Sequence, residues 1–444
     1  MRGLFFRKVL RLINYEKDKH ILEENKFSKN YKMGFKDFII YILGNKGKTS
    51  VLELDDFFKI KHKSVFRRMR MTTSKQNFSN RRMYINPEFF KKANKESIEE
   101  LYSSNKYQIS KFKGYRVFAI DGSQVKLPNT PQTREEFDVD LNSLKKSKTL
   151  KARVSVMSDV KNEFIIDSSI SSLHVGESVL AFENIEKASK IVDLNKSIIV
   201  FDRNYVSAEL ILQLLEKESY FIFRLKSDTY KKERDQMKTN DEWVDINLNG
   251  NRTRNIKNKE LKAKSEELDY LNMRILNVTL KTGEIETLLT NLPDEIANSA
   301  ELKNLYGERW QIEKGYDVLK NKLHIENFSG KKRISIEQDF FSQILMYNIL
   351  IEYKTECNMI LGKNPKYKNY KCEYKVNINI LAGKLKSSIY EMFLADTEEE
   401  RILIEEEVYN LAKKNIIKVK NKPSKPRTKN PLANKYPYNN RKNF

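Results

Sequence analysis

The stretch from residue 116 to residue 226 constrains the fold most, because its hydrophobic period alternates between strand-like and helix-like in a fixed order. Strands are expected at 116–127, 149–160, 162–172, 196–205 and 220–226, with helices at 179–192 and 207–218. The second and third strands are expected to form a hairpin around Lys161 and Asn162. The fourth is mostly apolar, which is typical of a sheet covered on both faces. The order strand, strand, strand, helix, strand, helix, strand predicts a three-layer α/β domain.

The segments on either side of this stretch differ from it in composition. Residues 1–108 are expected to be mostly helical, including an amphipathic N-terminal helix. Residues 227–285 are polar and lysine-rich with strand-like pieces, and we expect an inserted, mainly β subdomain there before 286–292 returns to the main sheet. A strongly apolar helix follows at 339–353. We therefore expect three domains, which are a helical N-terminal domain at 1–108, an α/β domain at 109–355, and a C-terminal helical region with a tail at 356–444.

The charge of the chain favours a polyanionic partner. Its net charge is +23 with a mean hydropathy of −0.65, which points first to nucleic acid and second to an acidic membrane surface. From Asn421 onwards there are seven Lys or Arg, four prolines and no acid, a composition that favours a disordered cationic tail. No segment is long and apolar enough for a transmembrane helix, and no signal peptide is indicated, so we expect a cytoplasmic protein without membrane partners. Cys357 and Cys372 lack the spacing of a zinc site or a disulfide framework.

One basic segment is a candidate for DNA contact. From Lys61 to Arg82 there are eight Lys or Arg and no acid, and the sequence from residue 72 has the Thr and Ser residues of a helix N-cap. A basic helix of this kind docks in a DNA groove, with Arg67, Arg68 and Arg70 as the candidate contacts. The alternative is a basic helix that faces solvent.

Three carboxylates stand out from the rest. Asp121 and Asp202 each close an apolar strand, and the C-terminal ends of parallel strands are where α/β sheets place ligands. Glu313 lies on a predicted helix, 306–320, whose polar arc also carries Tyr306 and Arg309. Carboxylate oxygens from three separate elements can bind two hard cations, which activate a nucleophile and stabilise the leaving oxygen in phosphodiester cleavage. Each aspartate alone is also consistent with a strand-end turn.

The same residues resemble a known family. Tyr306, Arg309, Glu313 and Lys320 have the spacing of the Y-R-E-K signature of insertion-sequence transposases of the IS4 group. The segment around Asp121, "VFAIDGS", resembles the first-aspartate segment of that group, and "IIVFDRNYVSAELI" resembles the second, with Asn204 in place of the common glycine. The resemblance spans about residues 30–355.

The resemblance implies an RNase H-like catalytic domain (a mixed sheet flanked by helices) with a β-rich insertion. It further implies a DDE triad of Asp121, Asp202 and Glu313 that holds two Mg²⁺ or Mn²⁺ ions. It implies cut-and-paste transposition of an insertion sequence, in which a homodimer assembled on the terminal inverted repeats joins them to target DNA in a prokaryotic nucleoid.

The resemblance and the charge together point to further contacts with DNA. Tyr306, Arg309 and Lys320 are expected to contact phosphates at the element end. Arg203 and Arg224 are weaker candidates, because either suits a structural ion pair equally well. Trp243 suits a stacking contact with a flipped base or a place in the core. We expect a structural role for His174. The alternatives that remain open are another RNase H-like metal-dependent nuclease and a catalytically silent, transposase-derived DNA-binding protein.

Overall fold

The computed structural model describes residues 3–28, 32–104, 107–137, 149–280, 283–363 and 373–419. The chain forms two compact units, Asn94–Val318 and Met1–Ala93 with Leu319–Phe444. These units do not coincide with the three consecutive domains that the sequence predicts, because the helices that follow residue 318 pack with those that precede residue 94. The predicted cationic tail from Asn421, and Cys372, lie outside the described residues.

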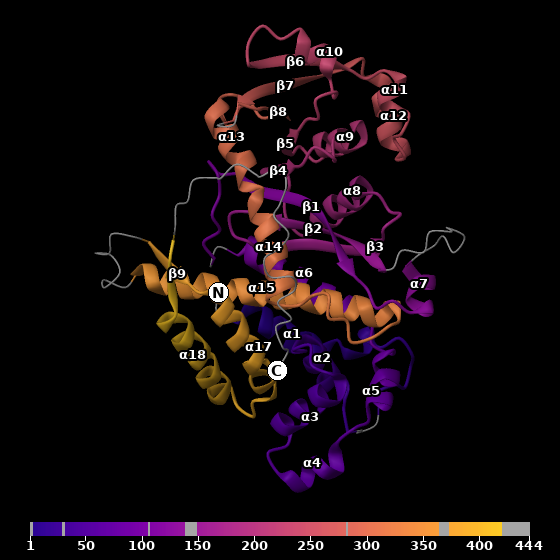
Figure 1. Ribbon diagram of the computed structural model, residues 1–444, viewed down its shortest axis with the longest axis vertical. Coiled ribbons are helices and arrows are strands. Elements are labelled where there is room, and N and C mark those ends of the chain that lie inside the picture. The colour runs from indigo at the N-terminus through magenta and orange to yellow at the C-terminus, as the bar shows by residue number, and fades with distance from the viewer. Residues whose placement is uncertain are drawn as a thin grey trace. The chain divides into compact units, whose positions relative to one another are not determined.

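The unit Asn94–Val318 contains one eight-stranded mixed sheet with the order β3-β2-β1-β4-β5-β8-β7-β6 (Figure 1). Its strands are β1 Arg116–Lys126, β2 Lys151–Asp159, β3 Ile165–Ser172, β4 Ser197–Phe201, β5 Tyr220–Arg224, β6 Asp241–Asn247, β7 Tyr270–Thr279 and β8 Ile285–Thr290. Strands β1, β2 and β3 are antiparallel, whereas β4 runs parallel to β1 and β5 runs parallel to β4. This order and these directions confirm the predicted mixed α/β arrangement and the hairpin between β2 and β3.

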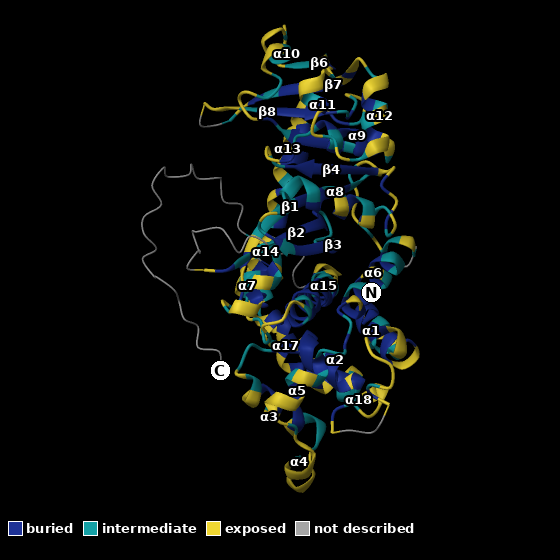
Figure 2. Ribbon diagram, turned by 90° about the vertical axis from the view of Figure 1, so that its right-hand side faces the viewer, coloured by how far each residue is buried: buried dark blue, intermediate teal, exposed yellow. Residues whose placement is uncertain are grey.

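The helices of this unit are α7 Pro131–Phe137, α8 Glu177–Ala188, α9 Ala208–Glu216, α10 Lys231–Asp235, α11 Gly250–Thr253, α12 Lys259–Glu267, α13 Ser299–Glu308 and α14 Trp310–Asn321. Helix α8 packs against β1, β2 and β3, and α9 packs against β5. One core cluster joins alternate residues of β1 and β4 to α13 and the start of α14, with the members Val117, Ala119, Ile198, Val200, Leu302, Leu305 and Ile312. Every residue of β4 is buried, as predicted for a strand covered on both faces (Figure 2).

The segment 227–285 differs from the separate, mainly β subdomain that the sequence predicts. It contains three short helices, α10, α11 and α12, beside the strands β6 and β7. These strands extend the main sheet, since β7 pairs with β8 and β8 pairs with β5. Helix α12 was not predicted, because its segment is polar. Its N-terminus is capped by the Asn258 side chain, which accepts from the Leu261 N–H at 3.1 Å.

Strand β1 has nearly the predicted bounds of 116–127, but Asp121 lies within it and does not close it, because pairing with β2 continues to Lys126 while the parallel pairing with β4 stops at Ile120. The predicted helix 306–320 is two helices that meet at Arg309, where the Arg309 N–H donates to the Tyr306 carbonyl at 3.1 Å. This bond spans three residues, as in a 3₁₀ turn, so the two helices do not share one continuous helical wheel.

The other unit is mainly helical. Its elements are α1 Leu4–Tyr15, η1 Lys17–His20, α2 Phe35–Leu43, α3 Ser50–Lys61, α4 Val65–Met71, α5 Lys75–Arg82, α15 Arg333–Lys363, α17 Ile378–Leu394, α18 Glu398–Lys414 and the short strands β9 Tyr374–Val376 and β10 Ile416–Lys418. Helix α15 is buried through most of its length and packs against α1, α2, α17 and α18, as expected for the apolar segment 339–353. Helix α6 Glu88–Ser103 passes from this unit into the other. None of the described helices has the length and apolarity that a membrane span requires.

Candidate active site

Asp121 and Asp202 lie side by side where the parallel pairing of β1 and β4 ends. In that pairing Ile120 is opposite Phe201, so Asp121 and Asp202 are the next residues along the two strands. Side chains alternate between the faces of a sheet, so Asp121 shares a face with Ala119 of the core cluster. This is the face on which α13 and α14 pack. Strand register and alternation therefore direct both aspartates towards the helix that carries Glu313.

Arg309 joins the carboxylates from the junction of α13 and α14. Its Nη2 lies 3.1 Å from Glu313 Oε1, and its Nη1 lies 3.6 Å from Asp121 Oδ2. The residue is 7% exposed, so this guanidinium is a buried cation between two carboxylates. Burial lowers its pKa, but Tyr306 and the three carboxylates outweigh that effect and raise the pKa overall. Arg309 is therefore a fixed positive charge within the site.

Two tyrosines orient the aspartates. The Tyr306 hydroxyl donates to Asp202 Oδ1 at 3.5 Å, and the Tyr316 hydroxyl donates to the Asp121 carbonyl at 2.8 Å. Burial raises the pKa of Tyr306 to about 12, with Arg309 opposing the shift. Both side chains come from α13 and α14. The sequence does not single out Tyr316, because a tyrosine among the apolar residues of a helix carries no signal for the partner of its hydroxyl.

The electrostatics of the site favour an added positive charge. Burial raises the pKa of Asp121 to about 6, while Arg309 and the Gly122 N–H oppose the shift and Asp202 and Glu313 add to it. The Gly122 N–H donates to Asp121 Oδ1 at 2.9 Å. The negative charge of each carboxylate disfavours ionisation of the other two, and the single positive charge of the guanidinium does not neutralise all three.

Two further carboxylates of this unit, Glu286 and Glu177, were not predicted from the sequence. On β8, Glu286 pairs with Arg224 at 3.2 Å, and its pKa is raised by burial, with Arg224 and Arg309 opposing and Asp202 adding to the shift. This ion pair is the structural role that was the alternative for Arg224. On the opposite face of β1, a Cβ at Gly122 would lie 3.2 Å from Glu177 and 3.3 Å from the Tyr205 hydroxyl, so only glycine fits there without displacing a neighbour.

The donor chemistry of the site fits a hard divalent cation. Asp121, Asp202 and Glu313 offer carboxylate oxygens, the ligands that Mg²⁺ and Mn²⁺ prefer. Within the described ranges, no three acidic, histidine or cysteine side chains converge closely enough to hold one metal ion. The Arg309 guanidinium forms ion pairs with both Asp121 and Glu313, so these two carboxylates share one positive charge. Carboxylates, a guanidinium and a phenol on one face suit a site that binds a phosphodiester together with a cation.

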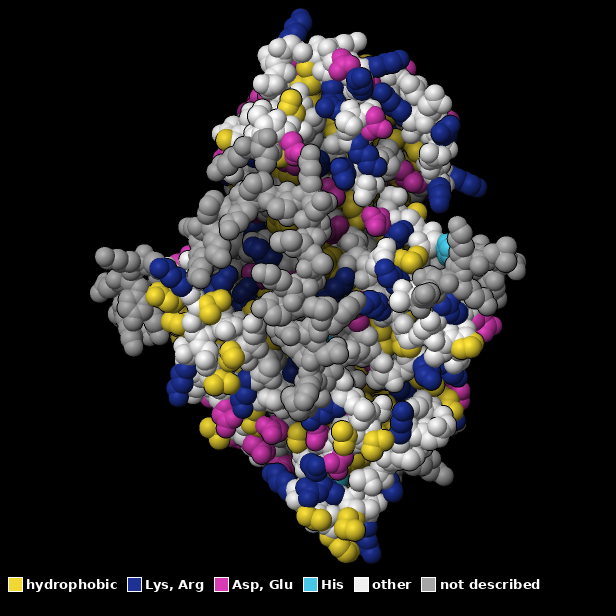
Figure 3. Space-filling view, in the orientation of Figure 1, with side chains coloured by type: hydrophobic (Ala, Val, Ile, Leu, Met, Phe, Trp, Pro, Cys, Tyr) yellow, Lys and Arg dark blue, Asp and Glu magenta, His cyan; other side chains and the backbone are white. Residues whose placement is uncertain are grey.

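The remaining candidates differ in their exposure to solvent. Lys320 is half-buried on α14, seven residues after Glu313. Arg203 is exposed directly after Asp202. Trp243 is 39% exposed on β6, so it is not a core residue. Figure 3 shows Lys and Arg side chains gathered over α10 to α12, in the segment that contains Trp243. His174 is exposed on the connection between β3 and α8.

The basic segment Lys61–Arg82 is divided between surface and core. Helix α4 has no buried residue and carries Arg67, Arg68 and Arg70, with Arg70 stacked 4.6 Å above the Phe66 ring. Arg82 is 2% exposed and pairs with Asp339 at 2.9 Å. Lys61 pairs with Asp37 at 2.6 Å. The uniform charge of the segment therefore does not mean that every cation faces a partner outside the chain. The predicted N-cap at the start of α5 is confirmed, because Ser74 accepts from the Asn77 N–H.

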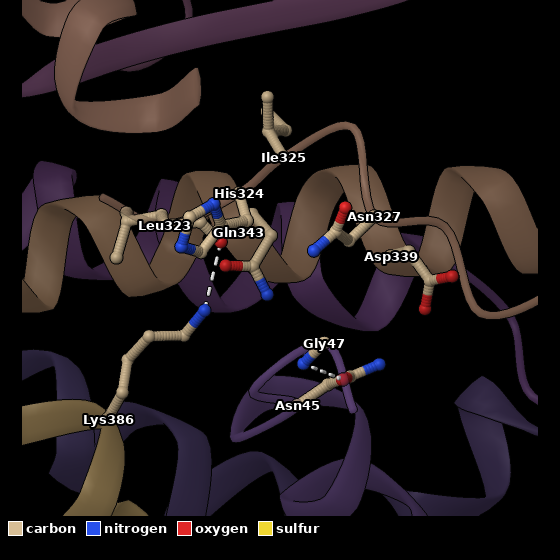
Figure 4. Close-up of a pocket in the computed structure, with 9 residues that line it drawn as sticks. All are labelled: Asn45, Gly47, Leu323, His324, Ile325, Asn327, Asp339, Gln343 and Lys386. Carbon is tan, nitrogen blue, oxygen red and sulfur yellow. Dashed lines mark hydrogen bonds between the residues drawn. The ribbon is translucent and has the colours of Figure 1, made fainter. Parts of the chain in front are cut away.

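A small cavity in the helical unit is too narrow for a substrate. Lys386 enters it and donates to the Leu323 carbonyl at 2.9 Å, near Gln343 and the side-chain amides of Asn45 and Asn327 (Figure 4). Its volume of about 10 Å³ is enough for roughly one water molecule. Among the described residues, Gln343 Oε1 has no hydrogen-bond partner, and a single water would satisfy it.

Comparison with known proteins gives one family. A family model described as a transposase DDE domain matches residues 112–349, more than half of the chain, and this range contains all three candidate carboxylates. The chain is 22% identical over 242 residues to the transposase InsG for insertion sequence element IS4 of Escherichia coli strain K12. That match covers 53% of this chain and 52% of InsG, so the chain spans about half the length of the curated relative that it matches. A cryo-EM structure of the piggyBac transposase synaptic complex with hairpin DNA has a TM-score of 0.45 and 11% identity, over 92% of this chain and 84% of that chain.

Proposed function

Because this chain belongs to the transposase DDE domain family, we propose that it is a DNA transposase that cleaves the ends of an insertion sequence and joins the 3′-hydroxyls to target DNA. The observation that carries the proposal is the buried Arg309 guanidinium between Asp121 and Glu313, with Asp202 directly after the strand that pairs with β1. The partial match to the transposase of an IS4 element supports a substrate of the same kind.

Transposases of this family use divalent metal ions, and we assign Asp121, Asp202 and Glu313 as the residues that hold two Mg²⁺ or Mn²⁺ ions. When bound, the ions would supply an activated nucleophile and would stabilise the leaving oxygen. Support comes from the donor chemistry of the three side chains and from the excess of negative charge over the one guanidinium. Tyr316 and Tyr306 would keep the aspartates in place through their hydrogen bonds.

The cationic and aromatic side chains are proposed to hold DNA. Arg309 and Lys320 would position the scissile strand. The Tyr306 hydroxyl has one proton, so it would exchange its 3.5 Å bond to Asp202 for a phosphate oxygen when the strand is bound. Arg203 is exposed beside Asp202 and suits a phosphate contact next to the site. Trp243 is accessible for stacking on an unpaired base. Arg67, Arg68 and Arg70 are proposed contacts to the DNA backbone further from the reacting bond.

The proposed partners are the terminal inverted repeats, the target DNA and a second copy of the chain. Two element ends must be held together for one insertion event. We therefore expect a homodimer assembled on DNA, with each copy supplying one set of carboxylates.

The test removes charge from each carboxylate without changing its size. Asp121→Asn, Asp202→Asn and Glu313→Gln are each expected to abolish strand cleavage while binding to an element-end fragment is retained, because the carboxylates hold metal and the cations hold DNA. The fragment would contain the inverted repeats that flank the coding region. Asp245→Asn, on an exposed part of β6 in the same unit, is the matched control and should cleave normally.

The outcomes separate the proposed transposase from its alternatives. Near wild-type cleavage in Mg²⁺ by any one of the folded triad variants contradicts the assignment. Cleavage without joining to target DNA would indicate another RNase H-like nuclease. End binding without cleavage by the wild-type chain would indicate a silent DNA-binding protein.

A further inference from the structure

Helix α4 presents large apolar side chains to solvent. Val65, Phe66 and Met69 are 60%, 65% and 78% exposed, and α4 has no buried residue. The helix packs against α3, and Figure 2 shows that it is mainly exposed. Single apolar side chains on a surface are normal, whereas contiguous ones mark interaction sites. These three neighbouring side chains, which we call the apolar ridge, are therefore a candidate contact surface.

Arginines of α4 flank the apolar ridge on both sides. At 100° per residue, Val65, Met69 and Phe66 lie within about 100° of one another around the helix. Arg68 lies about 60° beyond one edge of this arc, and Arg70 lies about 40° beyond the other. The Arg70 guanidinium also stacks 4.6 Å from the centroid of the Phe66 ring, which holds it beside the ridge. The helix therefore offers an apolar strip between two cations.

The charge of α4 selects a polyanion as its partner. Neither α4 nor the longer segment Lys61–Arg82 contains an acidic residue. A second copy of the chain that used the same helix would bring three arginines against these three, and like charges repel. Even an aromatic side chain buries at most about 250 Å², so three side chains fall short of the roughly 800 Å² that each partner of a stable protein pair contributes. A polyanion that carries an apolar group within reach fits the helix better.

The width of a helix favours the major groove of a DNA duplex. An α-helix with its side chains is about 10–12 Å wide, which matches the roughly 12 Å of the major groove and not the roughly 6 Å of the minor groove. The apolar group that protrudes from a base edge into the major groove is the 5-methyl group of thymine. When the apolar ridge points towards the base edges, the arginines on its two sides point towards the two strands that border the groove.

We propose that α4 lies in the major groove of DNA and recognises thymine methyl groups with the apolar ridge, while Arg68 and Arg70 contact the flanking phosphates. The arginines alone cannot select a sequence, because the phosphates are the same along every duplex. The ridge adds a preference for A·T pairs at the positions that it covers, because only thymine carries the methyl group. This inference rests on the proposed function, since it requires that DNA is the substrate.

The test removes the methyl groups from the DNA and the apolar ridge from the protein. A duplex of the element end and the same duplex with deoxyuridine in place of every thymidine differ only in the 5-methyl groups. Phe66→Ala with Met69→Ala, the ridge variant, shortens two exposed side chains and keeps a good helix former at both positions. Fluorescence anisotropy of the full chain at one fixed salt concentration would measure the affinity for each duplex.

The matched control removes two exposed apolar side chains from an acidic helix of the same unit. Ile402 and Leu403 are 40% and 67% exposed on α18, which begins with three glutamates. An acidic surface repels DNA, so Ile402→Ala with Leu403→Ala loses apolar groups of the same kind without touching the proposed interface.

Wild type is expected to bind the thymidine duplex about fourfold more tightly for each methyl group that the ridge covers, or about fifteenfold for two. The ridge variant should bind the two duplexes within about twofold of each other, whereas the control variant should keep the wild-type ratio. Both variants should bind the deoxyuridine duplex nearly as tightly as wild type does, because the contacts with phosphates remain.

Equal affinity of wild type for the two duplexes would overturn the proposal. So would a thymine preference that the ridge variant keeps, since another part of the chain would then contact the methyl groups. If the ridge variant keeps this preference but loses binding to phosphatidylserine vesicles, the ridge belongs to a lipid surface. If it keeps the preference and changes the sedimentation coefficient of the DNA-free chain, the ridge binds a second copy.

The failure of this inference is distinguishable from that of the proposed function. If wild type binds both duplexes equally well and the triad variants behave as proposed, this inference fails alone. If wild type binds neither duplex, the proposed function fails together with it.

Discussion

At the scale of single residues, Arg309 is the side chain whose role the structure changes most. The sequence predicts that it contacts a phosphate, whereas its guanidinium lies against Glu313 and Asp121. It is also buried, at 7% exposure. A fixed cation at this position offsets the repulsion between the carboxylates and limits the directions from which a phosphate can approach. We therefore expect Arg309 to position the carboxylates in addition to its proposed contact with DNA.

Replacing Arg309 with Ala should slow single-turnover cleavage by about a hundredfold, because the scissile strand loses its alignment with the carboxylates. Extra Mn²⁺ should not restore the rate. Removing a cation from beside Asp121 and Glu313 cannot weaken the attraction of these carboxylates for metal, so metal binding is not the step that is lost. A titration of the cleavage rate with Mn²⁺ measures this directly.

The matched comparison for Arg309→Ala is Glu313→Asp, which shortens a proposed metal ligand and leaves the guanidinium in place. Its rate is expected to recover in part as Mn²⁺ rises. Full recovery of Arg309→Ala at high Mn²⁺ would show that the arginine acts only by supporting the metal ligands and does not position the strand.

At the scale of elements, the N-terminus of α1 is capped by a side chain that is far away in the sequence. Helix α1 has no side-chain cap of its own. Instead Glu352 on α15 accepts from the Leu4 N–H at 2.7 Å and from the Phe5 N–H at 3.4 Å. Unpaired N–H groups at a helix start need such acceptors. Burial nevertheless raises the pKa of Glu352 to about 8, with the two N–H groups and Arg7 opposing the shift.

This raised pKa makes the stability of the helical unit depend on pH. Between about pH 4.5 and pH 8 the folded state keeps the Glu352 proton and the unfolded state does not, so the free energy of unfolding should fall as the pH rises through this window. The contribution of one group is at most about 1.4 kcal/mol per pH unit. Glu352→Gln should flatten this dependence, as measured by urea unfolding at several pH values.

Glu337→Gln is the control for Glu352→Gln, since Glu337 is a partly exposed carboxyl near the start of the same helix that pairs with Arg333 at 2.8 Å. The control should keep the wild-type dependence on pH. A Glu352→Gln variant whose stability changes with pH as steeply as that of wild type would show that Glu352 is already ionised in the folded protein at neutral pH.

At the scale of the whole molecule, the net charge of +23 favours a polyanionic partner, and the proposed binding to DNA should weaken as salt rises. Each cation that neutralises a phosphate releases counterions and contributes about −0.9 to the slope of log affinity against log salt. Helix α4 presents Arg67, Arg68 and Arg70 without a buried residue. Figure 3 shows hydrophobic and basic side chains together at this end of the helical unit.

Neutralising Arg67, Arg68 and Arg70 together should reduce the magnitude of this salt slope by about two to three. Salt titrations of binding to an element-end fragment would measure it. The control neutralises three exposed lysines in the other unit, Lys111, Lys190 and Lys196, and should leave the slope nearly unchanged. An unchanged slope in the α4 variant would place the contacts with DNA elsewhere on the chain.

The sequence by itself determined the order of the sheet elements and the identity of the candidate carboxylates. The apolar runs of β1 and β4 are local patterns, and they place Asp121 and Asp202 at strand positions before any long-range contact is known. The family resemblance that accompanied these residues is confirmed by the match to the transposase DDE domain and by the similarity to InsG. The β-rich insertion was predicted in part, since its strands exist but its polar helices were missed.

Only the tertiary structure decided which side chains surround the carboxylates. Arg309 meets Asp121, Glu286 meets Arg224, and Tyr316 donates to a carbonyl of β1, although each partner is far away in sequence. The division into two units is likewise a product of chain segments that meet after folding. Periodicity specifies the face of an element but not the register at which two elements pack. Contacts between distant side chains therefore depend on a geometry that no local pattern encodes.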